Sequence, residues 1–430
     1  MEKHDRVYET YLQILKEELI PAFGCTEPIA IALAAASARQ LLEGEVIRAK
    51  AVLSGNIIKN AKSVTVPGTG GLKGIEAAVA AGAAAGDATK GLEVISDTNS
   101  EKIEKIQAFL DQVPIQVEVM ESDHILDIQV TLFSAKENSS VQVQDAHNNI
   151  VRKEKNGQTI WKKETEEREG KGADRSLLNV KDILTFADIV ELNEIRPMIE
   201  RQIAYNMAIA EEGMKGDYGA NIGKVLKNTY GDDVKVLAKA MAAAGSDARM
   251  SGCSMPVVIV SGSGNQGITA SVPVAVYADY LKVPEEKKLR AVLLSDLVTI
   301  HQKTGIGKLS AYCGAISAGC GSGAGIAYLY GGDYKVIAHT LVNALAIVSG
   351  VICDGAKASC AAKIAVAVES GILGYFMYKE GQEFKAGDGI VTKGIEANIE
   401  NIGQLAKVGM KETDKEILHL MVDGRQLDSR

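Results

Sequence analysis

The chain is short of aromatic residues, of proline and of positive charge. Of its 430 residues, 5% are Phe, Trp or Tyr, and 8 are Pro. Its 47 Lys and Arg are outnumbered by 55 Asp and Glu, which gives a formal net charge of −8 at pH 7. A nucleic-acid partner needs a surface of excess positive charge that neutralises phosphates. The charge balance therefore predicts no nucleic-acid partner.

No segment has the features of a targeting or membrane-spanning sequence. The first residues, MEKHDRVYETYLQILKEEL, are charged and amphipathic, and they lack the apolar stretch of a signal peptide. The longest apolar run, at 336–353, carries His339 and Asn343, which favour a helix in a protein core over a membrane span. With six cysteines and no signal peptide, we predict a cytoplasmic protein with reduced thiols and no membrane partner.

Several catalytic motifs are also absent. The sequence has no Walker A motif, no G-x-S-x-G nucleophile elbow and no H-E-x-x-H zinc motif. The six histidines are scattered without the spacing of metal ligands. No lysine is marked out as an anchor for pyridoxal phosphate, so we expect none of this cofactor.

Glycine and alanine are abundant by contrast, with 43 Gly in the chain. Because small residues let helices approach closely, we predict an α+β protein whose larger domain is mostly helical. This Ala/Gly-rich domain, expected to be the catalytic one, is discontinuous and comprises residues 1–88 and 172–430.

Between these two parts the spacing of apolar residues changes. Apolar residues three and four apart at 103–113 predict an amphipathic helix, whereas LEVIS at 92–96 and the alternating patterns at 115–120, 126–133 and 141–144 predict strands. Residues 89–171 are therefore expected to form an inserted small α+β module. Its end, where KKETEEREGKGADR begins, is interpreted as a charged and solvated linker. The role of the module stays open.

One cysteine lies just ahead of a predicted helix, in the sequence GCTEP at 24–28. Thr26 is a good N-cap, Glu27 suits the positive end of the helix dipole, and Pro28 is tolerated in the first turn. A thiol at a helix N-terminus has a lowered pKa, so one interpretation of Cys25 is a thiolate that takes a proton or binds a metal. The alternative is a small buried hydrophobic residue.

The other five cysteines are Cys253, Cys313, Cys320, Cys353 and Cys360. Two pairs, 313/320 and 353/360, share a C-x6-C spacing, which on one straight helix separates the sulfurs by about 10 Å and is too far for a single ion. Gly355 can break the helix, and a turn there would bring Cys353 and Cys360 towards one centre. The spacing matches neither a zinc nor a ferredoxin motif, and small residues in tight helix packing are the other interpretation.

Two glycine-rich segments are suited to a small polar ligand. SGSGNQGIT at 261–269 offers backbone N–H groups for a carboxylate or phosphate, and Asn265 and Gln266 add neutral hydrogen bonds. PGTGG at 67–71 allows the same interpretation. In both segments the alternative is a loop that needs a positive φ.

Seven segments, taken together, resemble the L-cysteine desulfidase family, which is related to the α chain of the iron-sulfur L-serine dehydratases. In chain order they are PAFGCTEPIAIA, SGNIIKNA, VPGTGG, SGSGNQGI, KLSAYCGA, GVICDGAKASC and FKAGDGIV. The resemblance extends over nearly the whole chain, and the combination of GCTEP with CDGAKxxC is its most specific part. It implies a lyase, independent of pyridoxal phosphate, that converts L-cysteine by β-elimination to hydrogen sulfide, ammonia and pyruvate.

The resemblance also implies a cofactor and site residues. In that family three cysteines hold a 4Fe-4S cluster whose fourth iron is open, and the matching positions here are Cys313, Cys353 and Cys360. Cys25 matches the proposed catalytic base. Cys320 competes with Cys313 for the third ligand position, because its AGCGSG sequence is similar to a stretch of the serine dehydratases. A cluster of this kind is expected to be lost from aerobic preparations.

Polar residues of the same motifs are expected to hold the carboxylate and ammonium groups of a small amino-acid substrate. They are Thr26, Asn56, Thr69, Asn265 and Gln266. The alternatives are an L-serine dehydratase with the same cluster, a cluster-binding sensor without turnover, and a helical protein whose cysteines bind nothing. The sequence does not decide between L-cysteine and L-serine, and it leaves the oligomeric state open, with a homo-oligomer as one option.

Overall fold

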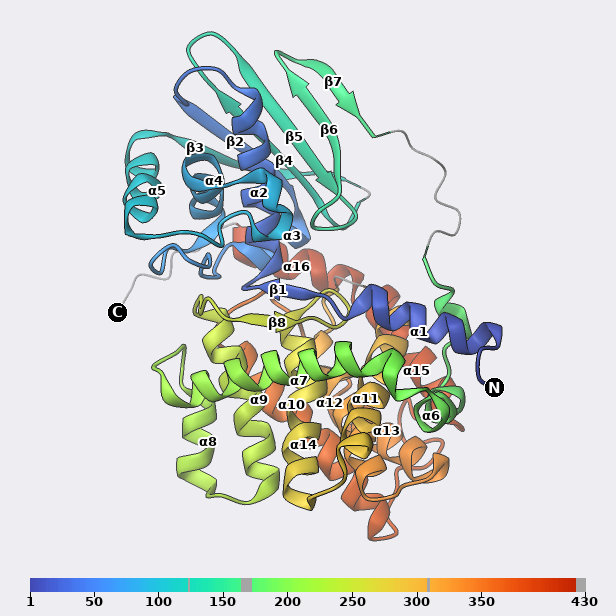
Figure 1. Ribbon diagram of the computed structural model, residues 1–430. Coiled ribbons are helices and arrows are strands. Elements are labelled where there is room, and N and C mark those ends of the chain that lie inside the picture. The colour runs from blue at the N-terminus through green and yellow to red at the C-terminus, as the bar shows by residue number, and fades with distance from the viewer. Residues whose placement is uncertain (123, 164–171, 308–309, 423–430) are drawn as a thin grey trace.

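The computed structural model describes residues 1–122, 124–163, 172–307 and 310–422 (Figure 1). It contains two large hydrophobic cores. The smaller core lies between a six-stranded sheet and helices that pack on one of its faces. The larger core lies inside a bundle of helices, below the sheet in Figure 1. The predicted α+β fold, mostly helical with a small sheet module, is confirmed.

The sheet module has the strand order β3-β2-β4-β5-β6-β7. β2 and β3 are parallel, and the other described neighbours are antiparallel. The strands are β2 Arg48–Ser54, β3 Ile115–Met120, β4 Asp127–Phe133, β5 Asn138–Gln144, β6 Ile150–Lys155 and β7 Gln158–Lys162. The helices of the module are α2 Thr26–Leu41, α3 Gly55–Ala61, α4 Gly74–Ala85 and α5 Ser100–Gln112, with a 3-10 helix η1 at Ala88–Glu93.

Alternation of side chains along the strands explains why helices cover one face. Ala51 of β2 pairs with Val130 of β4, which pairs with Val141 of β5, and all three side chains are fully buried. α2 and α4 pack against this apolar face. The opposite face is polar, and there the Thr131 hydroxyl donates to Ser140 Oγ at 3.0 Å.

The boundary between the cores differs from the predicted one at residue 88. Residues 29–83 belong to the smaller core together with the sheet, so the module begins at α2. The sequence pattern does not predict β2, because this segment forms a strand only through its pairing with β3 and β4. The predicted strand at 92–96 is instead the end of η1 and a turn, and the predicted glycine break SGNIIKNA forms α3. Most of the predicted linker, 164–171, lies outside the described residues.

The helical domain contains α1 and the helices from α6 onwards. Their bounds are α1 Arg6–Glu18, α6 Val180–Ile189, α7 Leu192–Lys215, α8 Ile222–Tyr230, α9 Val234–Met250, α10 Gly264–Leu281, α11 Glu285–Ile306, α12 Gly314–Leu329, α13 Tyr334–Val348, α14 Cys360–Lys379, α15 Ile395–Gln404 and α16 Lys411–Val422. Two short helices of other types are the 3-10 helix η2 Arg175–Leu177 and the π-helix η3 Leu405–Gly409. The antiparallel strands β1 Pro21–Phe23 and β8 Pro256–Val258 join this domain to the start of the module.

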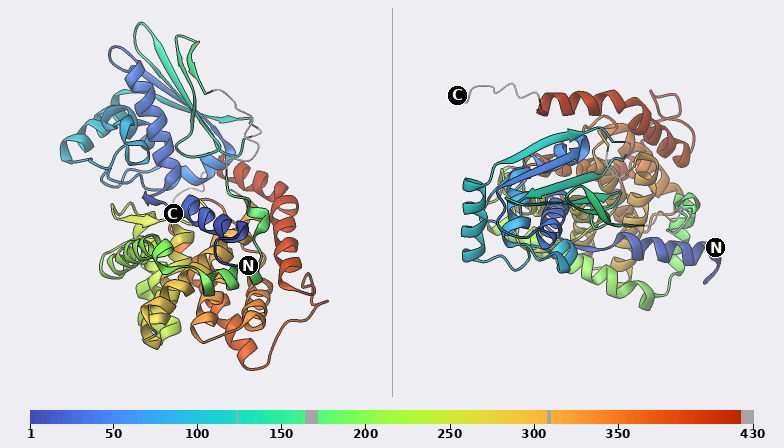
Figure 2. Two further views of the ribbon diagram at one scale, coloured as in Figure 1. Left: turned by 45° about the vertical axis from the view of Figure 1, so that its right-hand side comes forward. Right: turned by 90° about the horizontal axis from the view of Figure 1, so that it is seen from above.

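The C-terminal helices run along one side of the molecule and reach the sheet module, as the red ribbons in Figure 2 show. There the buried Lys59 of α3 forms an ion pair with Asp414 of α16. The last helix therefore connects the two domains on the side away from α1.

Small residues set the spacing between the central helices of the bundle. A Cβ added to Gly323 of α12 would lie 2.6 Å from the Cα of Gly371 in α14, and one added to Gly371 would lie 2.2 Å from the Gly319 carbonyl oxygen. α14 is also the one described helix long and apolar enough to cross a membrane, but 56% of its most apolar window is buried inside the protein. Its neighbours α9, α12 and α13 make it a core helix.

A substitution at this helix crossing tests how tightly the bundle is packed. Gly371→Ala should destabilise the protein by about 1–3 kcal/mol, because the added methyl group forces α12 and α14 apart. The measurement is the thermal midpoint followed by circular dichroism. Gly350→Ala is the control, since a Cβ there meets no atom within 4 Å. Equal midpoints for the two variants would contradict the close contact.

Candidate active site

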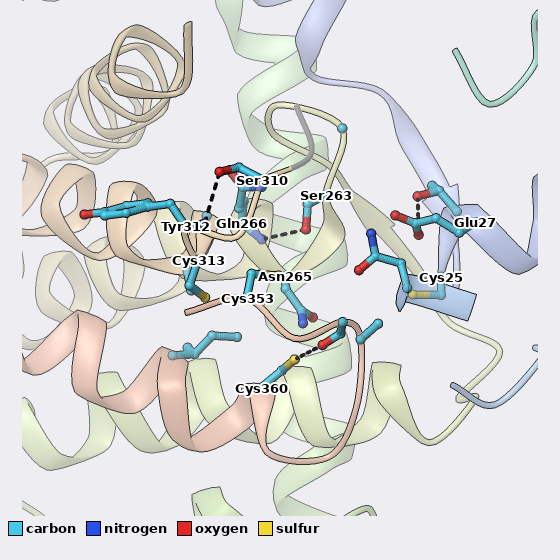
Figure 3. A pocket seen from close by; sticks show the side chains of 18 of the residues that line it. Cys25, Glu27, Ser263, Asn265, Gln266, Ser310, Tyr312, Cys313, Cys353 and Cys360 are labelled. Carbon is cyan, nitrogen blue, oxygen red and sulfur yellow. Dashed lines mark hydrogen bonds between the residues drawn. The ribbon is translucent and has the colours of Figure 1, made fainter. Parts of the chain in front are cut away.

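A cavity of about 110 Å³ lies where the two domains meet, and Figure 3 shows the side chains around it. The sheet module contributes the start of α2 and part of α3. The helical domain contributes the starts of α10 and α12, the end of α11 and the loop before α14. Four of the six cysteines line the cavity: Cys25, Cys313, Cys353 and Cys360.

Two chain segments pair next to each other and bring Cys313 and Cys353 together. Tyr312 and Ile352 form an isolated antiparallel bridge. The Cys313 N–H donates to the carbonyl of residue 351 at 3.1 Å, and the Cys353 N–H donates to the carbonyl of residue 311 at 2.6 Å. Both cysteines therefore sit on a paired backbone, and Cys313 also caps the N-terminus of α12.

A glycine turn then returns the chain to the same cavity at Cys360, as the sequence predicts. Gly355 has a φ of +94°, and a Cβ there would lie 2.0 Å from the Lys59 carbonyl oxygen. Only glycine fits this conformation and this close approach to α3. The Cys360 thiol lies 3.6 Å from the Gly355 carbonyl oxygen, and Cys360 begins α14.

Asp354 holds the turn between these two cysteines. Its carboxylate pairs with Lys357 within the turn and with Lys363 of α14, the latter at 2.5 Å. Lys363 also donates to the Ile352 carbonyl at 2.8 Å. Although burial opposes the charge, the two ammonium groups lower the pKa of Asp354 to about 2. The CDGAKASC segment is thus fixed by charge as well as by glycine.

Cys25 approaches the cavity from the sheet module, and in Figure 3 it lies across from Cys313 and Cys353. It is the N-cap residue of α2 and is only 3% exposed. The predicted lowering of its thiol pKa is wrong for the protein as described, because burial raises the pKa of Cys25 to about 12. The Arg249 guanidinium beside the thiol opposes this rise without reversing it.

Burial acts in the same direction on two further thiols of the cavity, those of Cys313 and Cys360. It raises the pKa of Cys313 to about 12, with the neighbouring Cys353 adding to the rise, and it also raises the pKa of Cys360. Buried thiols that repel each other as thiolates favour a bound cation that removes their protons.

The thiols that line the cavity are donors of the type that holds iron-sulfur clusters. Within the described ranges, no three His, Cys, Asp or Glu side chains lie close enough to hold one metal ion. In a cluster each thiolate binds a different iron, so the ligand sulfurs are spread around the cluster. Cys313 and Cys353 lie on two paired segments and Cys360 follows the turn, so three cysteines with these backbone positions line one cavity.

The family follows from sequence comparison. A protein-family model described as the serine dehydratase alpha chain matches residues 89–419. The chain belongs to the serine dehydratase alpha chain family. Membership indicates a lyase of amino-acid catabolism, in a family that is typically iron-sulfur dependent. The matched range includes Cys313, Cys353 and Cys360 but not Cys25.

Full-length relatives cover the part of the chain that the serine dehydratase model leaves out. A UPF0597 protein of Desulfitobacterium hafniense is 57% identical over 98% of this chain and 99% of its own. UPF0597 proteins of Lachnoclostridium phytofermentans and Fusobacterium nucleatum are 49% and 44% identical, over 97% and 96% of this chain and 100% and 98% of their own. Their names state no activity.

Three of the five polar residues predicted to hold a substrate line the cavity that contains the four cysteines: Thr26, Asn265 and Gln266. The Gln266 Oε1 atom is buried without a hydrogen-bond partner. Asn56 and Thr69 lie elsewhere. Asn56 lines a separate cavity of about 220 Å³ between α3 and α16, and the Thr69 hydroxyl donates to the Val66 carbonyl within its own turn at 2.7 Å.

The remaining cysteines are not in the cavity lining. Cys320 is fully buried within α12, where it packs in the larger core, and Cys253 packs against that core in part. The sequence leaves Cys313 and Cys320 as alternatives for the third ligand position. Cys313 lines the cavity, whereas Cys320 lies two turns further along α12 and does not.

Sequence motifs did not indicate two cationic side chains in the cavity lining, Arg249 of α9 and Lys303 of α11. Arg249 donates to the Gly24 carbonyl at 2.8 Å and to the Asn265 side-chain oxygen at 3.2 Å, so it links the residue before Cys25 to α10. Neither residue stands in a glycine-rich or cysteine-containing motif. A buried charged side chain indicates a functional residue, but the burial of Arg249 and Lys303 is known only from the packing of the helices.

A larger cavity of about 780 Å³ adjoins the cysteine cavity between the two domains. Gly262 lines both cavities. On the module side, His147 Nε2 lies 3.9 Å from Glu27 Oε1, so a residue of the larger cavity faces a residue of the smaller one. The inserted module therefore forms part of the approach to the cysteines.

Removing the charge of Asp354 tests how the cysteine turn is held. In Asp354→Asn, alkylation of Cys353 and Cys360 by iodoacetamide should be about 2- to 10-fold faster in the iron-free protein, since partly exposed ion pairs contribute up to about 1 kcal/mol each. Peptide mass spectrometry measures the rate at each cysteine. Asp388→Asn, in an exposed turn outside the cavity lining, is the control and should leave both rates unchanged. Unchanged rates in Asp354→Asn would show that the turn does not need this charge.

Proposed function

We propose that the protein is an iron-sulfur-dependent L-cysteine desulfidase that forms hydrogen sulfide, ammonia and pyruvate. The observation that supports this most is the shared cavity: three cysteines on one side and Cys25 on the other, with polar side chains between them. Membership of the serine dehydratase alpha chain family supports the lyase class. The choice of L-cysteine as substrate rests on the resemblance of the motifs.

Cys313, Cys353 and Cys360 would hold a 4Fe-4S cluster. When bound, such a cluster with one open iron supplies a Lewis acid that stabilises developing negative charge on the leaving group and carboxylate. Three protein ligands rather than four leave that position open. A fourth cysteine, Cys25, is near enough to line the same cavity but comes from the other domain.

The proposed reaction is a β-elimination. In the proposed step the thiolate form of Cys25, which burial disfavours and the neighbouring Arg249 guanidinium favours, takes the Cα proton. The Cα–H electron pair forms the Cα=Cβ bond, and the Cβ–S bond breaks so that sulfur leaves as HS⁻. The enamine product takes up a proton to become an imine, and water hydrolyses the imine to pyruvate and ammonia. Arg249 keeps Cys25 in place through its bond to the Gly24 carbonyl, while Asn265 and Gln266 are suited to orient the substrate.

L-Serine dehydratase is the second candidate, and the description of the matching family model favours it. The elimination is the same except that OH⁻ leaves in place of HS⁻. The same residues would serve both reactions, so only the leaving group separates the two candidates.

The first test is the colour and the substrate preference of anaerobically purified protein. It should be brown with a broad absorption near 400 nm, as is typical of thiolate-bound iron-sulfur clusters, and release sulfide and pyruvate from L-cysteine. Sulfide is measured with lead acetate or methylene blue, and pyruvate with lactate dehydrogenase. Pyruvate from L-serine at a higher kcat/KM would favour the dehydratase instead. Colourless, iron-free protein would refute both candidates.

Cysteine variants separate the base from the ligands. Cys25→Ala should keep its iron but lose about 10²- to 10⁴-fold in kcat, the usual contribution of a general base. Cys353→Ala and Cys360→Ala should lose iron and activity together. Cys313→Ala should behave like them, and Cys320→Ala is its matched control and should retain iron. Activity retained in Cys25→Ala, or iron lost in Cys320→Ala alone, would contradict these assignments.

A further inference from the structure

The cysteine cavity contains both signs of charge. Three of its described lining residues carry a charged side chain: Glu27, Arg249 and Lys303. Arg249 is already engaged with the Gly24 carbonyl and with Asn265. Glu27 and Lys303 are thus the charges available to a ligand, one negative and one positive.

Lys303 carries a buried ammonium group that no described residue pairs with. It is 5% exposed, and among the described residues no hydrogen bond or ion pair reaches its Nζ atom. The groups that act on it electrostatically are the thiols of Cys353 and Cys313 and the ammonium of Lys59. An unpaired buried cation is unfavourable in a folded protein unless an anion joins it. The side chain therefore indicates an anionic ligand on the cysteine side of the cavity.

Glu27 supplies the complementary charge at the other side. It lies in the first turn of α2, two residues after Cys25, and is 8% exposed. Its carboxylate accepts from the Thr26 hydroxyl at 3.2 Å, and the His147 ring lies 3.9 Å away. In the described part of the chain it is the one carboxylate that lines the cavity. A cationic ligand group would be held there, close to the thiol.

We propose that Glu27 binds the α-ammonium group and Lys303 the α-carboxylate of the substrate, so that the cavity selects an amino-acid zwitterion. The inference rests on the proposed function for the identity of the amino acid. A substrate held at both ends would have its Cα between Glu27 and Lys303, in the cavity that Cys25, Cys313, Cys353 and Cys360 also line. Lys303 and Glu27 thus determine which molecules bind as well as how they are oriented.

Two half-analogues of cysteine test each charge separately. Cysteamine keeps the ammonium and thiol but lacks the carboxylate, whereas 3-mercaptopropionate keeps the carboxylate and thiol but lacks the ammonium. Binding of each to the anaerobic iron-loaded protein is measured by isothermal titration calorimetry. Glu27→Gln should weaken cysteamine by about 10- to 100-fold and leave 3-mercaptopropionate unchanged, and Lys303→Met should do the reverse, as expected for loss of one buried charged contact.

Controls separate this proposal from the other roles of the two residues. Lys335→Met removes an exposed lysine outside the cavity and should change neither affinity. Iron content is measured in every variant. If Lys303→Met loses iron while its iron-loaded fraction still binds 3-mercaptopropionate as wild type does, Lys303 serves the cluster alone and the proposal is wrong. Unchanged cysteamine affinity in Glu27→Gln would also overturn it.

Failure of the proposed function remains distinguishable from failure of this inference. Calorimetry measures binding without turnover. Wild-type protein that converts neither L-cysteine nor L-serine would refute the desulfidase and dehydratase proposals. If the two variants still each lost affinity for the predicted half-analogue, the proposed zwitterion site would be supported.

Discussion

The pairing of residues 311–313 with 351–353 is the contact on which the candidate site depends. It fixes Cys313 and Cys353 on neighbouring backbones, and Gly355 then lets the chain turn closely over α3 to return at Cys360. Without the glycine, a side chain would collide with the Lys59 carbonyl and push the turn away from the cavity. Three thiols from two parts of the sequence thus line one cavity because of backbone geometry, while α12 and α14 continue the two segments into the bundle.

The site belongs to both domains, which gives the sheet module a structural role. Cys25, Thr26 and Glu27 come from the first turn of α2, whose remaining length is buried against the sheet. Helix and sheet therefore position the module's thiol rigidly, while the ion pair between Lys59 and Asp414 and the strand pair β1–β8 connect the module to the helical domain. A change in this interface would alter the distance between Cys25 and the other three cysteines.

Local periodicity predicted the elements whose pattern is complete in the sequence, such as α5 and strands β3 and β4. It failed for β2 and α3, because a short apolar segment becomes a strand or a helix according to what packs on it. The turn at Gly355 could be predicted from the sequence, because glycine adopts the positive φ that a sharp turn between Cys353 and Cys360 requires. The position of α2 in the sheet module could not be predicted, because an alanine-rich helix can pack in either of the two cores.

The chemistry of the site shows the same limit. A cysteine at a helix N-terminus suggests a lowered thiol pKa, but burial of Cys25 raises the pKa by more than Arg249 lowers it. This burial comes from the packing of Cys25 against Val64, Met250 and the turn before Cys360. A role for Lys303 could not be predicted from the sequence, because a lysine in a helix is ordinarily exposed to solvent. Only the packing of α11 buries its ammonium group beside two thiols. Motifs identify the groups that react, whereas the charges that surround them emerge from the fold. The charge balance of this cavity, more than its cysteines alone, therefore determines which small molecule it accepts.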